Sequence, residues 1–159
     1  RYLQTEQEWF GGGMDITPCL PYGEEKDYHL SLERICNKFD KTYYQKYKKW
    51  CDEYFYLPHR KESRGIGGIF FDYLHSDDWG RDLEFVQSVG KFFHLYIITT
   101  INSLKNKEWT DEEKNTQLIK RSRYAEFNLL HDRGTRFGLE TGGNIDAILM
   151  SMPPLAKWD

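Results

Sequence analysis

The 159-residue sequence lacks several features that would place it in a broad class at once. It has no apolar run near the roughly 20 residues that a transmembrane helix needs, and no secretory h-region, so we expect no transmembrane segment. Its 22 lysines and arginines nearly balance its 25 aspartates and glutamates, which leaves a net charge of -3. A charge this small gives no field over the whole chain that would favour nucleic acid or a membrane surface, and we expect neither as a partner.

Cysteine is scarce as well, with Cys19, Cys36 and Cys51 the three examples. Three is an odd number, and the spacing of these cysteines matches neither a zinc site nor a CxxC motif. Both observations favour free thiols in a reducing compartment. Motifs for nucleotide binding and nucleophilic catalysis are also missing, since the sequence contains neither GxxxxGK[ST] nor GxSxG. These absences argue against a P-loop enzyme and against a serine hydrolase.

Helical and strand patterns are clear in what remains. Apolar residues at helical spacing predict helices over 25–39, 42–55 and 79–104, and the capping box Thr110–Glu113 predicts another that runs to about 120. Strands are predicted over 65–74, 123–131 and 145–151, while residues 1–23 read as irregular around a short extended "MDIT". No repeat or linker interrupts the chain. The expected fold is a single α+β domain over 1–159, with a largely antiparallel sheet flanked by helices on its faces.

The segment "EFNLLHDRGTRFGLETGG" (126–143) is the most suggestive candidate for a site. Read as a strand and its continuation, it places Asp132 and Arg133 at the strand end, followed by the bare backbone of Gly142 and Gly143. Arginine forks suit planar carboxylates, and glycine N–H groups can approach a ligand closely. The pattern indicates an anionic ligand that also offers N–H donors to a carboxylate. Two other interpretations stay open: the polar residues form the solvent-exposed face of an antiparallel sheet, or Asp132 forms a salt bridge within the protein.

Other candidates are weaker. The segment "HRKESRGIGGIFFD" (59–72) places cations before a glycine-rich strand entry, and "WFGGGMD" (9–15) is a tight turn or a flat surface for a ligand. His29 and His59 can in principle share a metal ion across two helix ends. A surface or core histidine is the simpler interpretation of each.

Taken together, the stretches "WFGGGMDITP", "KKWCDEYFYLPHRKESRGIGGIFFDYL", "RYAEFNLLHDRGTRFGL" and "ILMSMPP" closely resemble the oxygen-dependent coproporphyrinogen III oxidase family. The family enzyme is about twice as long, and this chain resembles its C-terminal portion, with the N-terminal portion absent. The resemblance implies oxidative decarboxylation of two propionates of coproporphyrinogen III to vinyl groups, giving protoporphyrinogen IX. Dioxygen would be the co-substrate, with no organic cofactor.

The resemblance also implies roles for individual residues. Asp132 would collect the pyrrole N–H groups of the substrate, and Arg133 would pair with a propionate. The other implied substrate-binding residues are Asp15, Arg64, Gly142, Gly143 and Asn144, the last standing where the family usually has arginine. His29 and His59 match positions assigned to a divalent metal in bacterial relatives.

The resemblance implies a homodimer, with "ILMSMPP" in the dimer-forming segment, and a cytoplasmic location, or the mitochondrial intermembrane space in some eukaryotic relatives. The histidine proposed as proton donor in the family lies upstream of this chain, so we expect the chain alone to be inactive. A non-catalytic tetrapyrrole- or anion-binding module with the same Arg/Asp surface is the alternative function.

Overall fold

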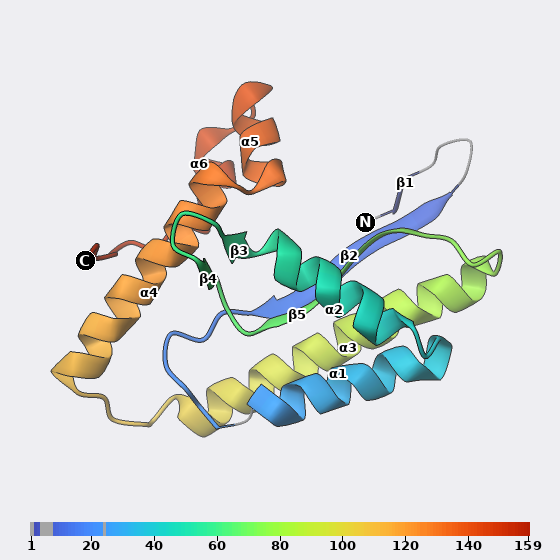
Figure 1. Ribbon diagram of the computed structural model, residues 1–159, viewed down its shortest axis with the longest axis horizontal. Coiled ribbons are helices and arrows are strands. Elements are labelled where there is room, and N and C mark those ends of the chain that lie inside the picture. The colour runs from blue at the N-terminus through green and yellow to red at the C-terminus, as the bar shows by residue number, and fades with distance from the viewer. Residues whose placement is uncertain (1, 4–7, 24) are drawn as a thin grey trace. The chain divides into compact units, whose positions relative to one another are not determined.

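The computed structural model describes residues 2–3, 8–23 and 25–159 (Figure 1). The chain divides into two compact units. The first comprises Arg1–Ile16, Tyr22–Tyr54 and Ile66–Glu108, and the second comprises Thr17–Pro21, Phe55–Gly65 and Trp109–Asp159. Helices and antiparallel strands both occur, so the predicted α+β class is confirmed. A single domain over 1–159 stays a prediction.

The first unit is built on an antiparallel sheet of strand order β1–β2–β5, with β1 at Tyr2–Leu3, β2 at Trp9–Ile16 and β5 at Gly67–Leu74. The register of β2 and β5 runs from Ile16 opposite Gly67 to Phe10 opposite Leu74. The strand predicted at 65–74 is confirmed. The extended conformation predicted for "MDIT" is confirmed over 14–16, which belong to β2. The prediction of irregular structure is wrong over 9–13, because β2 gains its hydrogen bonds from a partner far away in the sequence.

Three helices belong to the same unit: α1 at Glu25–Phe39, α2 at Tyr43–Tyr54 and α3 at Trp79–Leu104. All three were predicted from apolar periodicity, and their bounds agree with the prediction to within a residue. Asp78 caps α3, since its side chain accepts a hydrogen bond from the backbone N–H of Arg81.

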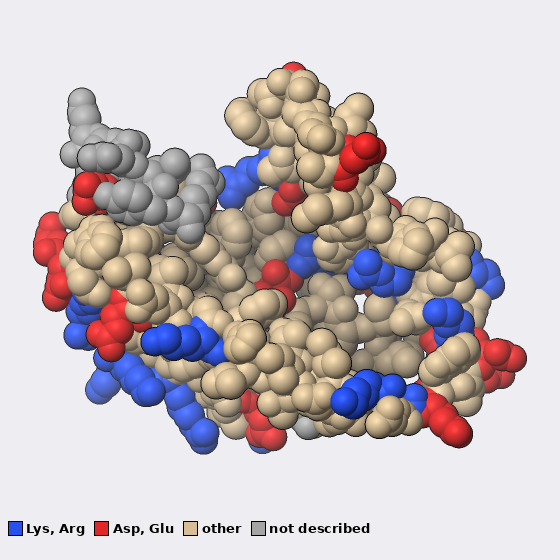
Figure 2. Space-filling model, turned by 180° about the vertical axis from the view of Figure 1, so that it is seen from behind, with Lys and Arg blue, Asp and Glu red and all other residues tan. Residues whose placement is uncertain are grey.

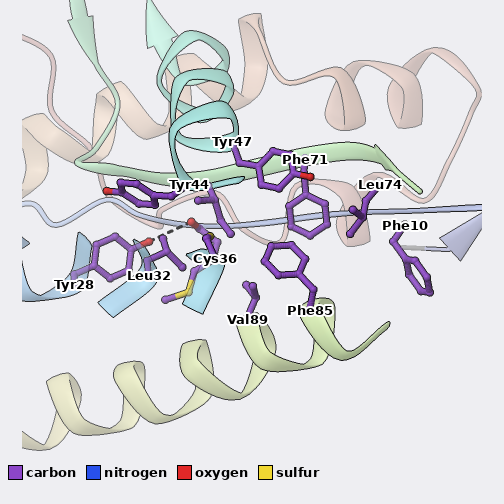
Figure 3. Close-up of a cluster of buried hydrophobic side chains, with 12 residues drawn as sticks. Phe10, Tyr28, Leu32, Cys36, Tyr44, Tyr47, Phe71, Leu74, Phe85 and Val89 are labelled. Atoms are coloured by element: carbon purple, nitrogen blue, oxygen red, sulfur yellow. Dashed lines mark hydrogen bonds between the residues drawn. The ribbon is translucent and has the colours of Figure 1, made fainter. Parts of the chain in front are cut away.

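The core of this unit lies where the three helices meet the two long strands, as the side chains in Figure 3 show. Aromatic rings carry much of it: the Phe71 ring lies 5.2 Å from the rings of both Tyr47 and Phe85, measured between centroids. Burying a large apolar side chain contributes roughly 1.5–3 kcal/mol to folding. The buried members of the core are Phe10, Met14, Tyr28, Leu32, Cys36, Tyr44, Tyr47, Ile69, Phe71, Leu74, Phe85 and Val89.

The second unit is mainly helical. A short hairpin, β3 at Tyr56–Leu57 and β4 at Glu62–Ser63, accompanies α4 at Asp111–Leu130, α5 at Arg133–Glu140 and α6 at Ile145–Ile148. The predicted capping box is confirmed, because the Thr110 side chain accepts from the Glu113 N–H and the Glu113 side chain accepts from the Thr110 N–H.

The strand predicted at 123–131 is wrong, and so is the helix end predicted near 120, because α4 continues without a break to Leu130. The alternation of apolar and polar residues that suggested a strand has another origin. In the last turns of α4, polar side chains are buried beside apolar ones, since the hairpin and the chain end pack against the helix. A short run of this kind does not distinguish a strand from a buried helix.

The strand predicted at 145–151 is wrong as well. Asn144 caps a single helical turn, α6, and a turn follows at Leu149–Met152. The apolar run "ILMSMPP" (148–154) therefore begins on the last residue of α6 and continues through this turn. A short apolar run does not distinguish a strand from a helix, and the N-cap Asn144 favours the helix at 145–148.

Candidate functional site

The DRGT motif begins a helix. Asp132 is the N-cap of α5, and its Oδ2 accepts a hydrogen bond of 2.6 Å from the backbone N–H of Thr135. Aspartate is favoured here because it satisfies an N–H that the first helical turn leaves open. Arg133 follows as the first helical residue and is exposed. The two residues therefore lie at the positive end of the α5 dipole, where a bound anion is stabilised.

The glycine pair forms the turn that joins α5 to α6. Gly142 has a φ of 71°, a left-handed conformation that other residues rarely adopt. The N–H groups of Gly142 and Gly143 donate to the carbonyls of Leu139 and Gly138, at 3.3 and 2.9 Å. In this arrangement both N–H groups are used inside the turn. Asn144 then caps α6, with its Oδ1 3.1 Å from the backbone N of Ala147.

Arg64 lies just after β4 in the same unit as Asp132 and Arg133. Its guanidinium carbon is 4.0 Å from the centroid of the Phe55 ring, 4.9 Å from that of Phe127 and 5.3 Å from that of Tyr124. Aromatic faces attract the cation, and they fix the plane of the guanidinium. A guanidinium held by its faces still presents donors in its plane to a carboxylate.

Asp15 lies in the first unit, on β2 opposite Gly68 of β5, and is half-buried. It is therefore in a different unit from the other predicted substrate-binding residues. The backbone is tightly packed at this point, since a Cβ added to Gly68 would lie 1.9 Å from the Met14 carbonyl oxygen.

His29 is also in the first unit, and both of its ring nitrogens have partners there. Nε2 lies 2.9 Å from the carbonyl oxygen of Ile66, so it must carry the proton, and Nδ1 lies 3.0 Å from the Tyr44 hydroxyl. Burial lowers the pKa of His29 and raises that of Tyr44 to about 12. Nδ1 of a neutral His29 therefore accepts from Tyr44, and neither nitrogen offers a lone pair to a metal ion.

His59 belongs to the second unit and is hydrogen-bonded to a carboxylate. Its Nε2 lies 2.7 Å from Oε2 of Glu126. Because both ring nitrogens of His29 already have hydrogen-bond partners, its geometry does not fit the predicted metal pair. Across residues 2–3, 8–23 and 25–159, no three His, Cys, Asp or Glu side chains gather in a group that could hold a metal ion.

Glu126 is the centre of a buried polar cluster that the sequence did not predict. Besides His59, its carboxylate accepts two hydrogen bonds from Arg60, at 2.9 and 2.6 Å, and one of 2.9 Å from the Trp158 indole N–H. The Arg60 guanidinium is the largest cause that lowers the pKa of Glu126 to about 2, against the opposing effect of burial. Arg60 directly follows His59 in the sequence. This pair of neighbouring cationic residue types was the one signal that could have predicted a buried carboxylate partner.

Arg123 extends this cluster along α4. Its guanidinium donates to Glu62 at 2.9 Å, to Asp159 at 2.8 Å and to the Ser122 hydroxyl at 3.1 Å. Asp159 and Glu62 raise the pKa of Arg123, although its burial opposes them. The cluster joins the hairpin, α4 and the chain end, and it keeps buried charges in pairs, as a protein interior requires.

On the exposed surface, acidic and basic side chains are interspersed, and no extended field of one sign appears on the face seen in Figure 2. The described helices include none that is long and apolar enough to span a bilayer.

Comparison with known proteins gives this geometry a context. The sequence model of a family described as coproporphyrinogen III oxidase matches residues 1–159. The chain belongs to this family. An oxygen-dependent coproporphyrinogen-III oxidase of Rickettsia bellii (strain OSU 85-389) is 53% identical over 159 residues, which cover 99% of this chain and 57% of the relative. The proteins of the same name from Rickettsia rickettsii (strain Sheila Smith) and Rickettsia akari (strain Hartford) are each 51% identical over 160 residues.

Membership of the coproporphyrinogen III oxidase family confirms the resemblance drawn from the sequence motifs. The chain spans 57% of the length of these curated relatives. In this family member the expected substrate-binding residues fall into two groups: Arg64, Asp132, Arg133 and the turn 142–144 lie in the second unit, and Asp15 lies in the first.

Proposed function

We propose that this chain forms part of an oxygen-dependent coproporphyrinogen III oxidase, which converts two propionates of its substrate to vinyl groups and gives protoporphyrinogen IX. The observation that carries the proposal is the family match over all 159 residues. Each decarboxylation releases carbon dioxide, a proton and an electron pair, and dioxygen accepts the electrons. The electron-rich pyrroles react with oxygen once they are positioned and deprotonated, so no organic cofactor is needed.

In this proposal, Asp132 binds the ring centre of the substrate. A carboxylate has about four acceptor positions, so one side chain can both cap α5 and accept hydrogen bonds from pyrrole N–H groups. The cap also fixes the side-chain orientation before substrate arrives. This kind of preorganisation lowers the cost of binding.

The propionates are held by arginine. Arg133 at the start of α5 pairs with one of them, assisted by the helix N-terminus, and Arg64 takes another with the edge of its aromatic-bound guanidinium. Gly142, Gly143 and Asn144 form the exposed turn between α5 and α6 and are the other substrate contacts proposed in this unit. Asp15, on β2 of the first unit, is proposed as a further substrate contact. A metal ion enters no step, because the geometry of His29 does not fit one.

The proposed location is the cytoplasm, since three cysteines are an odd number without a zinc or CxxC spacing, a pattern typical of a reducing compartment. The proposed assembly is a homodimer. Exposed apolar side chains on α5, on α6 and in the turn that follows support self-association, with Phe137 68%, Ile145 61% and Met150 83% exposed.

The test joins this chain to the part of the Rickettsia bellii relative that it does not match, and supplies coproporphyrinogen III with and without oxygen. We expect oxygen-dependent release of carbon dioxide by the chimera and none by the chain alone. Binding of coproporphyrin without carbon dioxide release would favour the tetrapyrrole-binding module instead. A folded chimera that neither binds nor decarboxylates would overturn both proposals.

A further inference from the structure

One arginine of α4 lacks the acidic partner that its neighbours have. The side chains of Lys120 and Arg123 are both paired with Glu62. Arg121, which lies between them in the sequence, is half-buried, and its guanidinium carbon is 4.5 Å from the centroid of the Tyr124 ring. Within the part of the chain that the structure describes, Arg121 makes no hydrogen bond and no ion pair. Its five N–H donors are therefore open to a ligand.

The same tyrosine ring contacts a second guanidinium. The guanidinium carbon of Arg64 lies 5.3 Å from the centroid of the Tyr124 ring, and all three residues belong to the second unit. Because one ring holds both guanidiniums, the distance between Arg64 and Arg121 cannot exceed the sum of their distances from its centroid. Two cations this close repel each other, and bound anions relieve the repulsion.

We propose that Arg121 binds a carboxylate of the ligand whose other carboxylate is held by Arg64, with Tyr124 fixing the planes of both guanidiniums. Stacking on an aromatic ring leaves the in-plane donors of a guanidinium available to a carboxylate. The inference rests on the proposed function for the identity of the ligand, a tetrapyrrole with four propionates. Arg64 and Arg133 account for two of these propionates, and Arg121 is placed to take a third.

The thiol of Cys19 lies close enough to Arg121 to report on its charge. Burial raises the pKa of Cys19, and the positive charges of Arg121 and Lys120 oppose that rise. A carboxylate bound to Arg121 would cancel part of this opposition, so the thiolate fraction of Cys19 would fall. Cys36 and Cys51 are buried, whereas Cys19 is half-buried, so Cys19 is the cysteine that a reagent reaches first.

The competing interpretation is a stacked pair that only stabilises α4. Side chains three residues apart on a helix are neighbours, and a guanidinium over a tyrosine ring is attracted to it without any ligand. In that case, loss of the Arg121 guanidinium would lower the stability of the protein and leave ligand binding unchanged. A carboxylate site predicts that ligand binding weakens.

The test titrates coproporphyrin III, the oxidised form of the proposed substrate, into the 159-residue chain and follows the porphyrin fluorescence. Arg121→Gln should weaken binding about tenfold or more, as the loss of one charged hydrogen-bonded pair does. Arg34→Gln is the matched control, because Arg34 is an exposed arginine of α1 in the other unit and its loss changes the net charge equally. The tetramethyl ester of the porphyrin, which has no carboxylate, should not distinguish Arg121→Gln from the wild type.

A second measurement is the rate at which iodoacetamide alkylates Cys19, since this reagent reacts with the thiolate. Coproporphyrin should slow the alkylation in the wild type and have little effect in Arg121→Gln. Circular dichroism establishes that each variant is folded. Equal affinity for coproporphyrin in folded Arg121→Gln and in the wild type would overturn the site, as would the absence of binding to the wild-type chain.

The chimera with the Rickettsia bellii segment separates this inference from the oxidase activity. A chimera that releases carbon dioxide and binds coproporphyrin equally well with and without Arg121→Gln would contradict the Arg121 site alone. An inactive chimera whose binding weakens tenfold in Arg121→Gln would contradict the oxidase activity alone.

Discussion

At the residue scale, Glu126 links the hairpin, α4 and the chain end through one carboxylate. Its folded pKa of about 2 lies below the ordinary value of 4.5, so its stabilising effect is complete above about pH 4.5 and is lost as the pH falls towards 2. We predict that Glu126→Gln lowers the free energy of unfolding at pH 7 by about 1.5–3 kcal/mol. The variant should also lose part of the acid-induced destabilisation.

Denaturant unfolding at several pH values measures both effects. Glu140→Gln is the control, since Glu140 is exposed and its nearest cation, on Arg136, is 3.6 Å away. Its stability should stay within error of the wild type. If the two glutamate variants behaved alike at pH 7, the Glu126 cluster would not stabilise the fold.

Asp132 has one structural and one proposed functional role, and a single substitution separates them. Asparagine caps helices about as well as aspartate, so Asp132→Asn should keep α5 and change the melting temperature little. It removes the negative charge that would collect pyrrole N–H groups, so turnover by the chimeric oxidase should fall by orders of magnitude. Asp132→Ala, in contrast, should lose about 1 kcal/mol of stability as well. Unchanged turnover in Asp132→Asn would leave the cap as the residue's role.

Arg133 is exposed at the first position of α5, so its replacement should disturb the fold little. A charged hydrogen bond to a propionate is worth about 1.5–3 kcal/mol. Arg133→Ala should therefore weaken substrate binding about 10- to 100-fold, and Arg133→Lys should restore only part of it. The Michaelis constant of the chimera measures this, with Arg136→Ala as the control on the same helix. A wild-type constant in folded Arg133→Ala would contradict the assignment.

At the element scale, β2 and β5 approach so closely that one glycine cannot be replaced. A Cβ on Gly68 would lie 1.9 Å from the Met14 carbonyl oxygen and 2.6 Å from the Tyr28 hydroxyl. Gly68→Ala should therefore push the strands apart and lower the melting temperature by several degrees or more. Gly90→Ala is the opposite case, since a Cβ there meets nothing within 4 Å and alanine is favoured by about 1 kcal/mol inside a helix. Thermal unfolding of both variants is the measurement, and a stabilised Gly68→Ala would refute the packing argument.

The second half of helix α4 was predicted to be a strand, and the residues that bury it explain why. The start of the helix was predictable because Thr110 and Glu113 form a local capping box. Its end was not, because the burial of Arg123 and Glu126 depends on the hairpin and the chain end, which lie far away in the sequence. The alternation of polar and apolar residues therefore suggested a strand with one solvent-exposed face. The segment is a helix whose polar side chains are buried in ion pairs with residues that are distant in the sequence.

At the scale of the whole molecule, the sequence predicted what depends on neighbours along the chain. The bounds of α1 and α3 follow from apolar spacing, and the family follows from long motifs. The residues of the candidate site were proposed by resemblance, but their places at helix caps were missed. Asp132 was placed at the end of a predicted strand, and Asn144 directly preceded another, although both are residue types that begin helices.

The chain as a whole should self-associate. Phe137 on α5 and Met150 in the turn after α6 are both exposed, and exposed apolar side chains of this size are typical of surfaces that bind another protein. We predict oligomers at micromolar concentration in sedimentation velocity, and a shift towards monomer in a double variant, Phe137→Ser with Met150→Ser. A monodisperse monomer at high concentration would contradict this prediction.

The unbroken course of α4 also limits how the length of the chain can change. From Asp111 to Leu130 the helix is about 30 Å long, and each residue added or removed turns its end by about 100° and moves it by about 1.5 Å. A single insertion within it would therefore carry His131, Asp132 and Arg133 to another side of the helix axis. The exposed connection at 105–109 has no such constraint. Related sequences should thus vary in length before Thr110 and keep a fixed count of residues from there to Asp132.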